Sequence, residues 1–516
     1  MADLFARKSM DMLVREAGDE EHGLKRALGP VNLVNLGIGA IIGTGIFVLT
    51  GSAAAQYAGP AIILSFVLAG IASALAGLCY AEFASLIPIA GSAYTYGYAT
   101  LGELFAWIIG WDLILEYAFG AATVAVGWSG YVNSFLQDRG IVFPPSLTAS
   151  PGTKLVFFNE RWTRLDSVKA VLSAKMSSAE ADAQLASLPA DTAYFNLIAF
   201  TAILLVTWIL VIGIKESAGL NTVIVFVKVG VLLTFVGIAI MWVMNNSAEA
   251  SRNWTPFLPP NTSGEYGKFG LSGVARGAAV IFFAYIGFDA VSTAAQESKN
   301  PQKDMPIGIL GSLAICTVLY ITVAGLLTAM VPYTALNVPD PIAVGIDKAG
   351  LRWGSFMVKL GAVCGLSSTM IVMLLGQSRV FFSMSRDGLL PSWAGAVHPK
   401  YKTPYVSTIL VGVMVAMFAG LVPIGILGEL VSIGTLLAFV IVCAGVIMLR
   451  RRDPDRPRPF KTPMVPFVPA LGAIISLYMM VSLPLDTWIR LVVWLAIGMV
   501  IYFAYSRHHS KVQKGT

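Results

Sequence analysis

Long apolar runs constrain this chain more than any other feature of its sequence. Five of them, residues 198–214, 223–244, 307–331, 406–421 and 491–505, each hold at most one charged residue. A helix needs about 20 mostly apolar residues to span the hydrocarbon core of a bilayer. The sequence therefore predicts an all-α membrane protein.

The composition indicates one large membrane domain. Of the 516 residues, 56% are apolar and only 12% are charged, whereas an ordinary soluble domain carries about 25% charged residues. The net charge of +6 is spread over short loops between apolar runs, so it does not indicate a nucleic-acid partner. The lipid bilayer is the expected surrounding of the chain.

We predict twelve spans from the apolar runs. They cover approximately residues 31–56, 60–87, 103–136, 192–214, 219–245, 271–297, 305–331, 353–384, 405–422, 424–449, 466–483 and 487–506. A long polar loop, residues 137–191, separates the third and fourth spans. Its part 167–188 could form short helices on the membrane surface.

Lys and Arg indicate the orientation of the spans. If the N-terminus lies in the cytoplasm, basic residues are more frequent in the cytoplasmic segments than in the outer loops. We therefore predict a multi-pass protein of the plasma (cytoplasmic) membrane with both termini inside. Residues 1–30 and 507–516 are then cytoplasmic tails, and no cleavable signal peptide is expected.

Two spans carry a glycine interruption. Gly39, Gly43 and Gly45 lie in the first span, and Gly287 lies among aromatic residues in the sixth. Glycine costs a helix about 1 kcal/mol relative to alanine, and interrupted spans at corresponding places in two halves point to a transporter site. Because these spans are five apart, a five-helix repeat would be inverted in the membrane. Close helix packing through Gly39 and Gly43 is the alternative.

An opened helix could bind both ends of an amino acid. Its half-helix start exposes backbone N–H groups that suit a carboxylate, and its unpaired carbonyls suit an ammonium group. An intact, aromatic-rich helix is the alternative for the sixth span. The predicted substrate-binding residues are Ile41, Ile42, Gly43, Thr44, Gly45, Phe283, Ala284, Tyr285, Ile286 and Phe288.

Charged residues inside the spans suggest proton coupling. Lys228 lies near the middle of the fifth span, where a charged lysine costs about 2.5–3.5 kcal/mol, so it could exchange a proton or instead snorkel to an interface. Glu116 follows Asp112 by one turn in the third span, and Lys228 or a cationic substrate is its expected partner. A structural hydrogen bond is the alternative for Glu116. Glu82, near the inner end of the second span, is expected to join helices.

No cofactor, metal ion or catalytic residue is predicted. The four cysteines all fall in apolar runs and are expected to be small buried packing residues rather than metal ligands or disulfides. All histidines lie in predicted cytoplasmic segments, and no Walker A motif is present. We therefore expect neither an enzyme nor an ATP-driven pump.

Several short motifs follow one another along the chain. They are residues 39–47, 80–83, the positions Pro88, Gly91 and 94–96, and residues 253–257, 282–289, 385–391 and 484–488. Taken together, they resemble the amino acid–polyamine–organocation transporter superfamily, in its cationic amino acid transporter branch. The resemblance covers about residues 25–508.

The resemblance implies a fold and a division of the chain. The fold is of the LeuT type, with alternating access around a site at the membrane midplane. Two inverted five-helix repeats would occupy residues 31–245 and 271–449, and two additional helices would lie in residues 466–506.

The resemblance also implies roles for individual residues. The amides of Thr44 and Gly45 would bind the substrate carboxylate. Lys228 would take the place of a sodium ion and serve in proton coupling, and Glu116 would influence transport from near the pocket. The substrate amino group would lie at the carbonyls of Ile41, Phe283, Ala284 and Ile286.

We therefore expect a secondary active transporter for amino acids, proton-coupled and sodium-independent, with cationic amino acids favoured. An amino acid/polyamine exchanger and a membrane nutrient sensor that does not transport are the alternatives. The expected partners are the amino acid substrate, a proton and the lipid bilayer. The exact substrate, the oligomeric state and any accessory subunit do not follow from the sequence.

Overall fold

The structure, a computed structural model, describes residues 4–8, 28–87, 92–173, 176–212, 218–401 and 403–514. Most of the predicted N-terminal tail lies outside these residues, as do Pro88 and Gly91 of the motifs. Within the described part, seven helical segments are long and apolar enough to cross a membrane, and five shorter apolar helices accompany them. Two of the predicted spans contain breaks, so these segments agree with twelve spans.

The first half of the chain begins with an interrupted span. Helix α2 (Pro30–Ile41) ends at a break, and the chain resumes in a π-helical turn, η1 (Gly45–Leu49). The segment then continues without a gap through α3 (Thr50–Ala53), η2 (Ala54–Ala58) and η3 (Gly59–Ala61). The remaining helices of this half are α4 (Ile62–Leu86), α5 (Ser92–Thr100), α6 (Glu103–Gln137), α9 (Leu197–Ile212), α10 (Ala218–Asn245) and α11 (Ser247–Asn253).

The second half repeats this order of elements. Helix α12 (Gly270–Ile281) passes into a 3₁₀ turn, η5 (Phe282–Tyr285), and the chain resumes as α13 (Phe288–Thr293). The main helices that follow are α14 (Pro301–Met330), α15 (Pro341–Lys348), α16 (Arg352–Arg386), α17 (Tyr405–Leu421), α18 (Ile424–Arg452), α19 (Phe467–Ser482) and α20 (Leu485–Ile501). The short ones are η6 (Ala295–Glu297), η7 (Tyr333–Ala335), η8 (Ser392–Gly395), η9 (Tyr502–Ser506), α21 (Arg507–His509) and α22 (Lys511–Lys514).

Corresponding helices of the two halves have similar lengths, and three of the pairs pack against each other. Helices α6 and α16 both have 35 residues, and each follows a short helix, α5 or α15. Helices α10 and α18 have 28 and 29 residues. The pairs α6 with α16, α4 with α14, and α9 with α17 are in extensive contact. From this correspondence we propose residues 31–245 and 271–449 as the two repeats.

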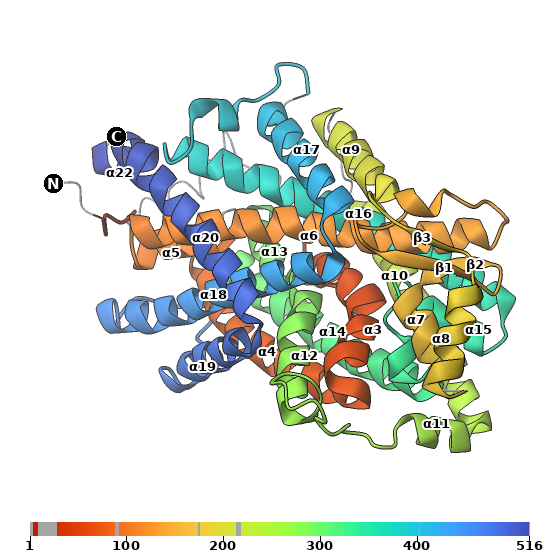
Figure 1. Cartoon of the computed structure of the whole chain (residues 1–516). Coiled ribbons are helices and arrows are strands. Elements are labelled where there is room, and N and C mark those ends of the chain that lie inside the picture. The colour runs from red at the N-terminus through yellow and green to blue at the C-terminus, as the bar shows by residue number, and fades with distance from the viewer. Residues whose placement is uncertain are drawn as a thin grey trace.

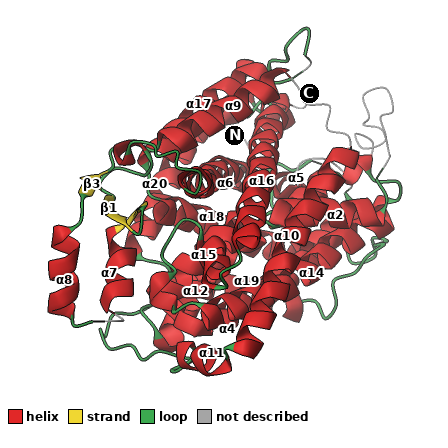
Figure 2. Ribbon diagram, turned by 90° about the vertical axis from the view of Figure 1, so that its right-hand side faces the viewer, coloured by secondary structure: helices red, strands yellow, loops and turns green. Residues whose placement is uncertain are grey.

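The long polar loop folds into a small unit of its own, which we call the loop unit (residues 145–192). A three-stranded antiparallel sheet in the order β2-β1-β3 joins two helices. The sequence predicted only the helices. The elements of the unit are η4 (Pro145–Leu147), β1 (Lys154–Phe158), β2 (Arg161–Arg164), α7 (Leu165–Ser173), α8 (Ser178–Ser187) and β3 (Ala190–Thr192). The unit lies at one side of the helical bundle (Figures 1 and 2).

Both ends of the chain meet on the side of the bundle away from the loop unit (Figure 1). The Lys8 ammonium lies 2.7 Å from the Asp387 carboxylate. The backbone N–H of Lys511 donates to the Asp387 carbonyl at 3.1 Å. Two ends on one side are what an even number of spans requires.

Side chains on the outer faces of the helices are apolar and exposed, as a bilayer requires. On α10, for example, Phe226 and Met241 are 69% and 65% exposed. The cysteine prediction is correct for Cys79, Cys316 and Cys443, which are buried, but wrong for Cys364, which is exposed on α16. An apolar run does not reveal which helix face a small residue occupies, because lipid and protein interior are both apolar.

Candidate functional site

The first break lies at the residues that the glycine pattern indicated. Helix α2 ends at Ile41, and Ile42 has an extended backbone with φ −70° and ψ 101°. The helical backbone resumes by Thr44. The first N–H groups of a helix have no partner within it, so the start of the second half-helix presents free donors beside the carbonyl groups that end the first.

The second break is held open by one glycine. After the 3₁₀ turn, Ile286 is extended with φ −62° and ψ 135°, and Gly287 has φ +119°. A Cβ atom at Gly287 would lie 2.7 Å from the carbonyl carbon of Ala40, and one at Gly45 would lie 2.2 Å from Cα of Ala284. The two breaks therefore touch through backbone atoms, and side chains larger than hydrogen would separate them.

Lys228 connects the first break to two other helices. From α10, its ammonium group donates hydrogen bonds to the carbonyl oxygens of Gly39 (2.7 Å) and Ile42 (3.0 Å) and to Oγ1 of Thr369 on α16 (2.9 Å). These three acceptors match the three donors of an ammonium group. The side chain is fully buried and passes close to Gly365. Lys228 thus points into the protein and does not snorkel.

Other side chains also hold the backbone of the breaks. The Tyr320 hydroxyl of α14 donates to the carbonyl of Ile41 at 2.8 Å, so a carbonyl predicted to meet the substrate already has a protein donor. The Tyr285 hydroxyl donates to the carbonyl of Phe66 on α4 at 2.9 Å. The ring of Phe288 packs on Tyr80 and Phe439, with centroid separations of 5.4 and 5.1 Å.

Lys228, one of the two partners expected for Glu116, is not its partner. Both residues are described, and no ion pair joins them. Glu116 instead lies near Thr435 of α18 and near Asp112 and Asp289, all buried. Lys228 donates to acceptors at the first break and on α16. Glu116 lies near Asp289, which follows the second break. Which neighbouring helix each residue faces depends on how distant helices pack, and this cannot be read from local sequence.

Asp289 stabilises the second break from its C-terminal side. One carboxylate oxygen accepts a hydrogen bond from the backbone N–H of Gly287 at 3.2 Å, and the other accepts from the Tyr117 hydroxyl at 3.0 Å. Tyr117 follows Glu116 directly on α6. The second break is therefore tied to the same helix that carries Glu116.

Oγ1 of Thr44 and Oε1 of Glu116 are among the buried polar atoms that have no hydrogen-bond partner in the described structure. Burying a polar atom without a partner costs about 1–3 kcal/mol. Thr44 packs on α6 at Gly127, where a Cβ would lie 3.0 Å from its methyl group. Unsatisfied atoms of this kind are candidates for contact with a bound ligand.

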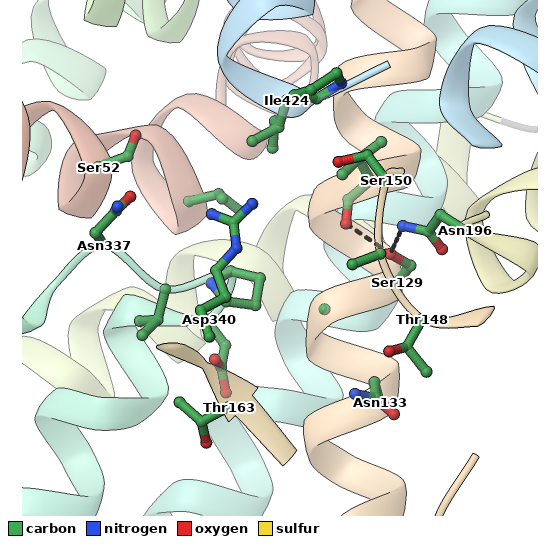
Figure 3. Close-up of a pocket in the computed structure, with 18 of the residues that line it drawn as sticks. Ser52, Ser129, Asn133, Thr148, Ser150, Thr163, Asn196, Asn337, Asp340 and Ile424 are labelled. Atoms are coloured by element: carbon green, nitrogen blue, oxygen red, sulfur yellow. Dashed lines mark hydrogen bonds between the residues drawn. The ribbon is translucent and has the colours of Figure 1, made fainter. Parts of the chain in front are cut away.

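Sequence reasoning did not find the cavity between the helices and the loop unit. It measures about 420 Å³ and is lined by residues of α6, the 337–340 segment, the start of α18 and the loop unit. Figure 3 shows Ser52, Asn133, Asn337 and Asp340 around it. Val48 of η1 also lines the cavity, four positions after Thr44. No short motif marks this cavity, because its residues come from distant segments.

Glu82 joins helices on the side of the chain ends, as predicted. Its carboxylate accepts hydrogen bonds from Arg450 Nε (2.8 Å) and Nη2 (3.0 Å) and from the N–H of Thr462 (2.8 Å). Arg458 Nε lies 3.3 Å away. Part of the arginine-rich segment at and after the end of α18 therefore has a structural role in addition to any effect on orientation. The described residues contain no group of side chains suited to hold a metal ion.

The sequence is similar to several transporters. The branched-chain amino acid permease BcaP of Bacillus subtilis is 46% identical over 99% of this chain and 99% of its own. The methylthioribose transporter of Bacillus subtilis is 44% identical over the full length of both chains. The vacuolar cationic amino acid transporter 4 of Arabidopsis thaliana is 36% identical over 88% of this chain and 68% of its own.

A solved structure has the same fold. MhsT, determined in complex with L-phenylalanine, matches with a TM-score of 0.52 over 92% of this chain and 99% of its own, at 13% sequence identity. The likeness supports the LeuT-type arrangement of helices. The sequence relatives of this chain are transporters rather than enzymes. A family model described as amino acid permease matches residues 28–504, and the chain therefore belongs to the amino acid permease family of the amino acid–polyamine–organocation superfamily.

Proposed function

We propose that this chain is a proton-coupled, sodium-independent amino acid transporter of the plasma membrane, with both termini in the cytoplasm. The observation that carries the proposal is the set of three hydrogen bonds from Lys228 to Gly39, Ile42 and Thr369. A fixed ammonium at a broken helix supplies the positive charge that a bound cation would otherwise bring. Because a buried lysine can release its proton, the same group can couple transport to pH.

The substrate would bind at the opened backbone. The N–H groups at the start of η1, with the Thr44 hydroxyl, suit a carboxylate. The carbonyls at the end of the first half-helix and in residues 283–286 suit an ammonium group. A bound substrate would favour the outward-facing or the inward-facing state, whichever binds it more tightly. Loss of the Lys228 proton would weaken the hydrogen bonds by which Lys228 joins α10 to the first break and to α16. It would therefore also shift the equilibrium between the two states.

We further propose a preference for cationic side chains. Glu116 is buried, and its Oε1 has no hydrogen-bond partner among the described residues, so a cationic substrate would supply the missing donor. Neutral branched-chain amino acids are the second candidate, and the 46% identity to a branched-chain permease favours them. Methylthioribose, the substrate named for another relative, has no ammonium group for the carbonyls to bind.

Uptake into proteoliposomes tests these proposals. The purified chain is reconstituted without sodium, and uptake of labelled L-arginine, L-leucine and methylthioribose is measured with and without an imposed pH gradient, acidic outside. The proposal expects accumulation of an amino acid only with the gradient, and arginine ahead of leucine. Accumulation that requires sodium, or that is indifferent to pH, would contradict it. Counterflow in the absence of a gradient separates a transporter from a sensor that only binds.

An exchanger gives a different result in the same vesicles. It accumulates label only when the vesicles are loaded with unlabelled amino acid or polyamine, with or without the pH gradient. Empty vesicles with a gradient are therefore the decisive condition, and protein-free vesicles at the same gradient are their control.

A further inference from the structure

The loop unit is a folded element with fixed side chains. It has its own small core, formed by Val156 of β1, Val168 and Leu172 of α7, and Ala181 and Leu185 of α8. Strands β1 and β2 are joined in tight register, with Phe158 opposite Arg161. Without a core, a polar segment of this length would adopt many conformations over the bundle. The core gives the residues of β2 defined positions above the helices.

Ion pairs hold this unit on the bundle. Arg161 of β2 pairs with Asp138 at the end of α6 and lies 3.5 Å from Asp347 of α15. Lys359, fully buried on α16, lies 2.6 Å from the same Asp138. The N–H of Trp162 also donates to Oε1 of Gln137 at 2.9 Å. The network joins β2 to three helices and explains a lysine at the end of a membrane span.

Strand β2 then forms one wall of the 420 Å³ cavity. Arg161, Thr163 and Arg164 all line it. The two arginines differ, because Arg161 is engaged in ion pairs whereas the side chain of Arg164 has no hydrogen bond or ion pair with any described residue. The carboxylate of Asp166, which is exposed, acts electrostatically on this guanidinium. Partial burial lowers the pKa of Arg164 but leaves a guanidinium charged at neutral pH.

Two carboxyl groups from outside the loop unit also line the cavity. Asp340, in the segment before α15, lines it, and burial raises the pKa of this carboxyl group despite Lys359 and Arg161 nearby. Glu429 of α18 lines it too and accepts a hydrogen bond from Thr487 at 2.6 Å. The walls therefore present both a guanidinium and carboxyl groups, a combination that suits a zwitterion.

We propose that this cavity is a second, outer binding subsite for amino acids, in which the Arg164 guanidinium binds the substrate carboxylate and Asp340 accepts a hydrogen bond from its ammonium group. A guanidinium binds a carboxylate through two parallel N–H···O bonds. Val48 places one wall of the cavity on the same half-helix that begins at the first break. The subsite would hold the substrate before it reaches the central site, so it rests on the proposed function.

Binding stoichiometry tests the subsite. Equilibrium dialysis of the detergent-purified chain with labelled L-arginine and L-leucine gives the number of molecules bound per chain. We expect two for the transported amino acid in the unsubstituted chain and one in Arg164→Gln. We expect Arg164→Lys to retain part of the second site, and the decarboxylated amines agmatine and isopentylamine to leave it empty.

Transport kinetics provide the second readout and the control. Arg164→Gln should raise the KM for uptake about tenfold, equivalent to about 1.4 kcal/mol, with little change in the maximal rate. Lys154→Gln removes one positive charge at an exposed position of β1 that does not line the cavity, and should leave both values unchanged. One molecule per chain in the unsubstituted protein, or equal KM in Arg164→Gln, would overturn the subsite while the proposed function stands. If no amino acid binds at all, both proposals fail.

Discussion

The ammonium nitrogen of Lys228 lies 3.0 Å from the carbonyl oxygen of Ile42, the residue at which α2 loses its helical backbone. The same carbonyl accepts a second hydrogen bond from Oγ1 of Thr369 at 3.3 Å. One peptide group at the break therefore receives donors from α10 and α16. Any change in the charge of Lys228 acts directly on the backbone where the substrate is proposed to bind.

Lys228→Met tests the coupling role of this amine. Methionine has a long apolar side chain that fills much of the same volume but neither carries a proton nor donates to the carbonyls of Gly39 and Ile42. We expect uptake driven by a pH gradient to fall at least tenfold, or about 1.4 kcal/mol. Proteoliposome uptake at several external pH values measures the effect.

Lys359→Met is the matched control for this substitution. Lys359 is also fully buried, but its partner is Asp138 beside the loop unit. This variant should lose thermal stability, because Asp138 loses a partner, while its uptake still responds to the pH gradient. A Lys228→Met protein whose uptake follows pH like the unsubstituted chain would rule out the proposed proton role.

Gly287→Ala tests whether contact between the two breaks is required. A positive φ costs a residue with a side chain about 1–3 kcal/mol, and the added methyl group would meet the carbonyl of Ala40. We expect a lower melting temperature and a loss of most uptake. Fluorescence-detected thermal unfolding and transport in vesicles give the two values.

Gly237→Ala on α10 provides the comparison, because no atom lies within 4 Å of the added methyl group. This exchange should stabilise the helix by up to about 1 kcal/mol and leave uptake unchanged. Equal behaviour of the two alanine variants would mean that the second break does not need its glycine.

The spans and both breaks could be predicted because each depends on local composition. Apolar length sets the span, and Gly39, Gly43, Gly45 and Gly287 weaken the helices where they occur. The neighbours of Glu116 and Lys228 could not be predicted, because they depend on how distant helices pack. Which helix face Cys364 occupies was likewise undetermined by the sequence.

The sheet in the loop unit had a local signal that could have been read. Residues 154–158 and 161–164 are rich in aromatic and β-branched side chains. The two residues between them, Asn159 and Glu160, both have positive φ, as a two-residue hairpin turn requires. Asparagine is common in such turns and glutamate is not, which made the hairpin difficult to recognise.

Glu82→Ala should destabilise the chain by about 3–5 kcal/mol. Glu82 is buried, and its removal leaves the Arg450 guanidinium without its carboxylate partner and the Thr462 N–H without its acceptor, which is costly where water does not replace the carboxylate. Thermal unfolding in detergent measures the loss. Glu82→Ala combined with Arg450→Ala should be less destabilising than the sum of the two single variants, because the pair has been removed together. Strict additivity would show that the contact contributes nothing, and Arg451→Ala, at an exposed position, should change little.

The C-terminal segment should stabilise the chain through one buried carboxylate. Glu103, fully buried at the start of α6, accepts hydrogen bonds from the hydroxyls of Tyr98 (2.8 Å) and Tyr502 (3.0 Å), from the Gln513 amide (2.7 Å) and from the Ser510 hydroxyl. Deleting residues 510–516 removes two of these four donors. We expect a loss of about 1–3 kcal/mol, visible as a lower melting temperature.

The comparison that isolates this contact is a deletion of residues 515–516 alone, which leaves Ser510 and Gln513 in place. This shorter deletion should melt like the full chain. Glu103→Gln in the full chain should also be destabilised. The four donors share the two carboxylate oxygens of Glu103, whereas a glutamine amide offers them only one acceptor oxygen. If the 510–516 deletion melts at the temperature of the full chain, the tail is not held by Glu103, and the meeting of the two chain ends at Asp387 has to be stabilised by other contacts.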